Sequence, residues 1–121
     1  MPLVLLRYSE YAKESGALVR ARQLLPSLIS RHLSVEGEGK LFPADIEIWA
    51  QPCSQEDCDP NDHDLQVVIF ANHYSQRVEI LEEAEVEIRQ GLIAKMPARL
   101  RGYVWILFCP AAFGEFNTGR W

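Results

Sequence analysis

The chain has 121 residues, of which 48% are hydrophobic and 24% are charged, and its formal net charge is −5 at pH 7. This length and composition predict one globular domain with a small hydrophobic core. No basic run interleaves with aromatic residues, which argues against a nucleic-acid partner, and no apolar stretch approaches the roughly 20 residues that span a bilayer. The first apolar run is too short for a signal peptide, so we expect a cytoplasmic protein without a membrane partner.

Residues 2–9 predict the first strand. Pro2 precedes a nearly continuous apolar run from Leu3 to Leu6, which is typical of a strand covered on both faces. If Met1 is removed, Pro2 carries a secondary amine, and free α-amino groups titrate near pH 8, roughly. An apolar environment lowers that pKa, so such an amine can act as a general base at neutral pH. Many chains begin with Met-Pro without any chemical role for the proline, and this alternative stays open.

Residues 10–33 predict a helix, because apolar residues such as Leu18, Leu25 and Ile29 recur at three- and four-residue spacing along one stripe. Pro26 lies inside this pattern. A proline in a helix interior removes a backbone hydrogen bond and clashes with the preceding turn. We therefore expect a kink or a break at Pro26.

After a glycine-rich loop, residues 44–50 alternate between apolar and polar side chains, which predicts a half-buried strand. Residues 51–62 are polar and predict a long loop or hairpin. Cys53, Cys58 and His63 lie in or beside this loop, but their spacing misses the common zinc patterns and no fourth ligand is evident. We therefore predict no metal, and we expect the cysteines of this chain to be reduced thiols.

The second half repeats the order of the first. Residues 65–71 predict a strongly apolar strand, Ser75 a helix N-cap, residues 78–95 a second helix and residues 102–109 a fourth strand with bulky side chains on both faces. The tail, residues 111–121, is too apolar to extend freely, and packing on a neighbouring chain would explain its composition. Its large apolar residues are Phe113, Phe116 and Trp121.

The two halves, about 1–52 and 63–110, share a strand–helix–strand pattern within one domain spanning 1–121. This predicts the α/β class, with two βαβ units forming a four-stranded sheet and two helices on one face. The bulky strand residues on the opposite face then need cover that a monomer does not supply, so we expect an oligomer.

The order and spacing of these features resemble the tautomerase superfamily, in particular its branches typified by 5-carboxymethyl-2-hydroxymuconate isomerase and macrophage migration inhibitory factor. The resemblance covers nearly the whole chain, and each motif alone is of low specificity. The motifs similar to the isomerase branch are Met1-Pro2, Tyr8-Ser9, Leu25-Pro26-Ser27-Leu28, Phe42-Pro43, His63-Asp64, Arg77, Pro110 and Phe116-Asn117. Those similar to the other branch are Gly39-Lys40, Tyr103-Val104-Trp105 and Ala111-Ala112.

The resemblance implies a homotrimer whose active site lies between subunits around the amino-terminal proline. It implies keto–enol proton transfer on a small unsaturated 2-oxo or 2-hydroxy acid, a reaction of aromatic compound catabolism, with Pro2 as general base and no cofactor. Arg77 or Lys40 would bind a carboxylate or polarise a carbonyl. Three aromatic residues would exclude water from the substrate site: Tyr103, Trp105 and Phe113. The muconate isomerases carry another arginine on the second strand, where this chain has acidic residues, so the resemblance is weaker for a dicarboxylate substrate than for the fold.

Two other functions stay open. One is a non-catalytic trimer of the same fold that binds a ligand or a protein. The other is a redox or metal protein built on Cys53, Cys58 and His63. For the binding residues themselves, Arg77 fits a surface residue at a helix start and Lys40 a solvated loop lysine, while the aromatic residues fit a trimer core.

Overall fold

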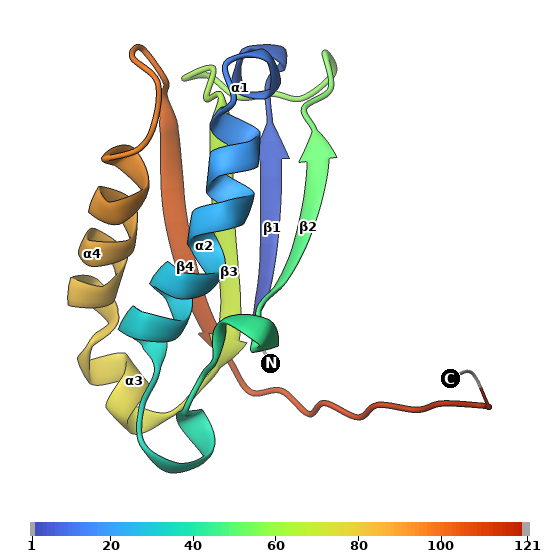
Figure 1. The fold of residues 1–121 in the computed structure, drawn as a ribbon, viewed down its shortest axis with the longest axis vertical. Helices are drawn as coiled ribbons and strands as arrows, with labels where there is room; N and C mark the ends of the chain where they lie inside the picture. Colours follow the sequence, from blue (N-terminus) through green and yellow to red (C-terminus); the bar gives the residue numbers. More distant parts are fainter. Residues whose placement is uncertain (1, 120–121) are drawn as a thin grey trace.

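The computed structural model describes residues 2–119 as a four-stranded mixed sheet with helices packed on one face (Figure 1). The strand order is β2-β1-β3-β4; β1 and β3 are antiparallel at the centre, and the outer pairs β1–β2 and β3–β4 are parallel. This arrangement confirms the predicted fold class, with two βαβ units joined through the antiparallel pair β1–β3. The strands are β1 Leu3–Tyr8, β2 Glu47–Pro52, β3 Leu65–Asn72 and β4 Gly102–Cys109.

The helix predicted over residues 10–33 is two helices, α1 (Glu10–Glu14) and α2 (Ala17–Leu33). The break lies at Gly16, whose φ of 87° is in the left-handed region that glycine adopts at little cost. Pro26 does not split the helix, because α2 continues through it. The break that was expected as one of two alternatives at Pro26 lies instead at Gly16, while the other alternative, a kink at Pro26, stays a prediction.

Both boundaries of the strand predicted over residues 44–50 differ, because the observed strand β2 ends at Pro52. The strand predicted from residue 44 begins at Glu47, because the residues before it form the short 3₁₀ helix η2 (Pro43–Asp45), in which the Asp45 carboxylate accepts a 2.8 Å hydrogen bond from the Phe42 backbone N–H. A second 3₁₀ helix, η1 (Gly37–Gly39), precedes it.

The helix predicted over residues 78–95 is α3 (Ser75–Glu79) followed by α4 (Leu81–Ile93). The N-cap position of α3 belongs to Tyr74 and not to Ser75, and no side chain caps that helix. The predicted strand over residues 102–109 is confirmed in full as β4.

The hydrophobic core lies between the helices and the sheet. Side chains alternate along each strand, so every second residue faces the helices. On that face the central strands contribute fully buried residues: Val4, Leu6, Val67 and Ile69. The helices close the core with Ala21, Leu25, Ile29, Leu33, Ala84, Ile88 and Leu92.

The opposite side of the sheet, here called the open face, is apolar and lacks cover within the described chain. The strand registers place Trp49, Leu5, Val68 and Trp105 in one row across all four strands. The tryptophans at the two ends of this row are 52% and 58% exposed. The cover that the sequence analysis expected on this side is therefore not supplied by the helices or the tail of the same chain.

The tail after β4 forms neither helix nor strand up to residue 119 and extends away from the sheet (Figure 1). Phe113 is 62% exposed and Phe116 is 89% exposed, so neither packs on the body of its own chain. Trp121, the other aromatic residue expected to pack, lies outside the described residues. Among residues 2–119 no helix is long and apolar enough to cross a membrane.

Candidate functional site

Pro2 lies directly before β1, at the end of the sheet where β3 and β4 finish. Its side chain is fully buried. The alternation that turns Val4 and Leu6 toward the helices places the Pro2 ring on the same covered face. Its carbonyl accepts a 3.2 Å hydrogen bond from the backbone N–H of Glu47, which fixes the start of β1 against β2. The expected removal of Met1 concerns a residue outside the described chain.

Arg77, in α3, is 2% exposed, and its guanidinium donates to three backbone carbonyls. Nε donates to Leu33 O at 2.9 Å, one terminal nitrogen donates to Asn72 O at 2.9 Å, and the other donates to Gly39 O at 2.8 Å. These oxygens belong to the end of α2, the end of β3 and the end of η1. Arg77 therefore connects three separate segments of the chain at the Pro2 end of the sheet.

The Arg77 charge has no acidic partner among the described residues, where the ion pairs involve other side chains. Its nearest aromatic neighbour is Tyr74, whose ring centroid lies 5.0 Å from the guanidinium carbon. Burial lowers the pKa of Arg77 because the charged form loses its hydration. The alternative of an ordinary surface arginine is wrong, since the side chain is buried. The expected contact with a substrate carboxylate remains a prediction, and the geometry favours a structural role.

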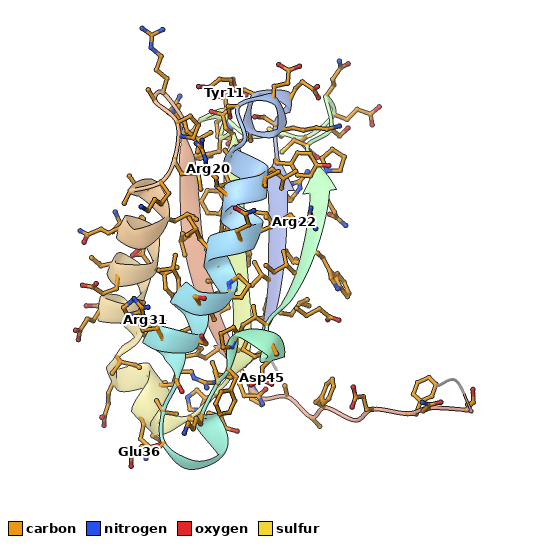
Figure 2. The ribbon with its side chains drawn as sticks, in the orientation of Figure 1. Tyr11, Arg20, Arg22, Arg31, Glu36 and Asp45 are labelled. Carbon is orange, nitrogen blue, oxygen red and sulfur yellow. The ribbon has the colours of Figure 1, made fainter. Side chains whose placement is uncertain are left out.

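Lys40 is exposed and lies beside Phe42, with Nζ 5.4 Å from the ring centroid. It follows Gly39, one of the Arg77 acceptors, so it belongs to the same loop at the Pro2 end. Figure 2 shows Glu36 and Asp45 in this segment between α2 and β2. Lys40 also borders an open cavity of about 470 Å³ that is otherwise lined by Ser34, Val35, Glu36 and Gly37. A role in binding substrate stays a prediction for Lys40.

Two of the three predicted aromatic site residues, Tyr103 and Trp105, lie away from Pro2 within one chain. Tyr103 is at the opposite end of β4, about 17 Å from the level of Pro2 along the strands, given a rise of roughly 3.3 Å per residue. Trp105 lies halfway along the edge strand β4 on the open face, and Phe113 lies in the tail, which leaves β4 at its Pro2 end and leaves Phe113 62% exposed. If Tyr103 and Trp105 enclose the Pro2 site, they must come from a second copy of the chain.

Tyr103 instead belongs to a polar cluster at the far end of the sheet. The rings of His63 and Tyr103 meet edge to face with centroids 5.0 Å apart. Nδ1 of His63 lies 3.1 Å from both carboxylate oxygens of Asp59, which also accepts from Gln66 Nε2 at 3.0 Å. The backbone N–H of His63 donates to the same carboxylate at 2.7 Å and is the main cause that lowers the pKa of Asp59.

Sequence reasoning considered His63 as a metal ligand and missed its pairing with Asp59. The available signal was the four-residue separation within a turn-forming Asp-Pro-Asn-Asp segment, residues 59–62. Within residues 2–119 no group of three histidine, cysteine or acidic side chains is arranged to hold a metal ion. Cys53 and Cys58 are free thiols, and burial raises the pKa of Cys53.

An apolar cavity of about 370 Å³ also lies at this far end, between α4 and the beginnings of β3 and β4. It is remote from Pro2. Its polar boundary includes Arg89, Arg99 and Tyr103. Its apolar walls are Leu65, Val67, Leu92, Ile93, Met96, Pro97, Leu100 and Val104.

No family model matches the chain, and no curated protein matches it either. Solved structures do resemble it. A 5-carboxymethyl-2-hydroxymuconate delta-isomerase has a TM-score of 0.63 at 13% identity, covering 97% of this chain and 89% of the isomerase. A fused 4-OT wild-type symmetric trimer has a TM-score of 0.58 at 12% identity, covering 89% and 85%.

A third structure, of a protein inactivated by 2-oxo-3-pentynoate, has a TM-score of 0.54 at 12% identity, covering 97% of this chain and 93% of that protein. At these identities the similarity concerns the backbone. The arrangement of two βαβ units, predicted from the sequence, is thus the fold of the tautomerases, and this chain has the tautomerase fold.

Proposed function

We propose that the chain is a tautomerase or isomerase that moves a proton in a small unsaturated 2-oxo or 2-hydroxy acid, with Pro2 as the general base. The observation that carries this proposal is the place of Pro2. Its ring is buried at the start of a central strand, in a fold shared with a muconate isomerase and with a protein that 2-oxo-3-pentynoate inactivates. An amine held against an apolar core is biased toward its neutral form.

The proposed reaction begins with a Pro2 nitrogen that is free because Met1 has been removed. This nitrogen accepts a proton from the enol hydroxyl or the α-carbon of the acid, and it returns the proton at another carbon of the conjugated system. Negative charge develops on the substrate oxygen during the transfer, and a cation stabilises that charge. Lys40 is an exposed cation at the Pro2 end that can contact a carboxylate, whereas the three nitrogens of Arg77 donate to backbone carbonyls.

We further propose a homotrimer that buries the open face, since one chain leaves Trp49 and Trp105 more than half exposed. A neighbouring copy would then supply the aromatic wall that a single chain does not bring to Pro2. Static light scattering tests this proposal. A monomer at micromolar concentration would contradict both the trimer and a site built between subunits.

The catalytic proposal is tested by following turnover of phenylenolpyruvate and 2-hydroxymuconate with protein whose intact mass shows that Met1 is absent. The matched control is the same protein with Met1 retained, because its Pro2 nitrogen is an amide without basicity. Only the Met-free protein should be active. Equal activity of the two forms would exclude Pro2 as the base.

A second test does not depend on choosing the right substrate. Met-free protein is incubated with 2-oxo-3-pentynoate and digested with trypsin, and the peptide ending at Arg7 is analysed by mass spectrometry. We expect the added mass on Pro2, and none in the Met1-retaining control. Modification of lysines alone, at equal extent in both forms, would contradict a nucleophilic amine at Pro2.

The competing function is a non-catalytic trimer that binds a ligand or a protein. It is favoured by one observation: Arg77, the arginine expected to hold a substrate carboxylate, already donates to three carbonyls. This alternative predicts that neither assay distinguishes the two forms of the amino terminus while the protein remains a trimer.

A further inference from the structure

At the end of the sheet where β1 starts lies a buried positive charge that has no acidic partner in the part of the chain that the structure describes. Arg77 is 2% exposed, and its three hydrogen-bond acceptors are carbonyl oxygens, which satisfy its donors but do not neutralise it. Among the described residues, Arg89 at the far side of the molecule pairs instead with the carboxylate of Glu85. The Arg77 site therefore keeps a net positive charge, whereas an arginine–carboxylate pair has none.

This charge lies close to Pro2. The antiparallel register pairs Leu3 with Phe70, so Pro2 is opposite Ala71, and the next residue, Asn72, supplies an Arg77 acceptor. The strand spacing of about 4.8 Å, plus one hydrogen bond, puts the guanidinium roughly 10 Å from Pro2. Both side chains lie on the helix-covered side of the sheet, where the chain is least hydrated.

Other charged or titratable groups surround the same end, and the structure distinguishes them from Arg77. Glu47 is exposed, Lys40 is exposed, and the Asp45 carboxylate is engaged by the Phe42 backbone N–H. Solvent and salt screen exposed charges far more than buried ones. The other titratable groups on these segments are Glu36, His73, Glu79 and Cys109, which are exposed, and His32 and Tyr74, which are partly buried, Tyr74 against Arg77.

We propose that Arg77 is a positioning residue that acts on Pro2 and not on the substrate. It holds the ends of α2, η1 and β3 together around the start of β1, and its unneutralised charge favours the uncharged, proton-accepting form of the Pro2 nitrogen. This inference rests on the proposed function for its biological meaning. Its physical content, an effect of Arg77 on the protonation of Pro2, is measurable without any substrate.

The test is a titration of the Pro2 amine by NMR in Met-free protein labelled with [¹⁵N]proline. One unit charge at roughly 10 Å, in a medium of effective dielectric constant about 20, shifts the pKa of an amine by about one unit. We expect Arg77→Met to raise the pKa of Pro2 by about this amount, because the protonated amine is no longer repelled by a nearby cation. Arg77→Lys keeps the charge and should move the pKa much less, and Arg89→Met is the matched control that should not move it.

An unchanged pKa of Pro2 in Arg77→Met would overturn the proposal. So would an equal shift in Arg77→Met and Arg77→Lys, which would make geometry and not charge the cause. If Arg77→Met does not fold, Tyr74→Glu and Tyr74→Gln replace it. The glutamate neutralises Arg77 from the position of the stacked ring, so the pKa of Pro2 should be higher in Tyr74→Glu than in its glutamine control, and equal values would contradict the proposal.

Kinetics separate this role from a substrate contact. If Arg77 acts through Pro2, Arg77→Met moves the acidic limb of the kcat profile to higher pH. If Arg77 holds the substrate carboxylate, the variant raises KM and leaves that limb in place. Absence of tautomerase activity would contradict the proposed function. The NMR titration would still show whether Arg77 changes the pKa of Pro2.

Discussion

Replacing Arg77 with methionine should destabilise the protein, and the structure allows the size of the effect to be worked out. Methionine fills much of the same volume but removes three charge-assisted hydrogen bonds of 2.8 to 2.9 Å. Such bonds are worth about 1.5–3 kcal/mol each, or about 4–9 kcal/mol together. Removing the buried guanidinium also recovers a desolvation cost of several kcal/mol. The net loss should therefore be about 3 kcal/mol, because the unsatisfied carbonyls outweigh the recovered hydration.

Urea denaturation followed by circular dichroism, at one fixed protein concentration, measures this loss. With a slope of about 2 kcal/mol/M, the midpoint should fall by about 1.5 M. The urea midpoint of Arg77→Lys should lie between those of the parent protein and Arg77→Met. A single ammonium cannot reach all three carbonyls with the geometry of a guanidinium. The control, Arg89→Met, removes a partly exposed arginine with a single ion pair to Glu85, and it should lower the midpoint far less than Arg77→Met. A midpoint for Arg77→Met that matches this control would refute the description of Arg77 as a structural connection.

Three further predictions concern other parts of the molecule. Pro2→Ala should keep the fold and lose about 10²- to 10⁴-fold in turnover, the usual contribution of a general base; full activity would reduce Pro2 to the first residue of a strand. Trp105→Lys should convert the trimer to monomers in light scattering with unchanged far-ultraviolet circular dichroism, because it puts a charge on the apolar open face, and an intact trimer would place the interface elsewhere. The pKa of Asp59 is lowered in the folded state, mainly by the His63 backbone N–H, so its contribution to stability is present above pH ~4 and is lost as the pH falls through the folded value. Asp59→Asn should therefore lose less stability on acidification than the parent, and an equal acid slope would contradict this linkage.

The elements that the sequence predicted well are those whose pattern depends on burial alone. The strand β4 was predicted with its observed bounds because a continuous apolar run lies between Gly102 and Pro110, and both residues interrupt regular structure. The helix break was misplaced for a different reason. Propensity penalises Pro26 inside a helix, but α2 packs along the sheet with its apolar stripe buried, and tertiary packing of that stripe holds the helix together through the proline.

The candidate site was harder to predict because its contacts join residues far apart in the chain. The resemblance singled out Arg77 for a substrate carboxylate or carbonyl, and the alternative was a surface residue. Within the folded chain its acceptors include the carbonyls of Leu33 and Gly39, 44 and 38 residues away, which neither interpretation predicted. The pattern of side chains along the sequence does not predict the direction in which a distant backbone carbonyl points. The separation of Tyr103 from Pro2 likewise follows from the parallel register of β4 on β3, which is a property of the whole topology.

The two halves have the same strand–helix–strand order and pair antiparallel through β1 and β3, so Pro2 can be compared with a residue at the start of the second half. Pro2 begins the helix-facing series of Val4 and Leu6, and Leu65 begins the corresponding series in β3. The backbone N–H of Leu65 donates to the Arg101 carbonyl at 3.1 Å, a bond that proline cannot make, and Leu65 borders the 370 Å³ cavity. If the two halves descend from one duplicated unit, divergence left one copy with an ordinary interior amide and gave the other a ring nitrogen at the same position. Leu65 therefore allows a comparison within one chain: its backbone N–H only donates to a neighbouring carbonyl, whereas the Pro2 nitrogen has no such bond to make.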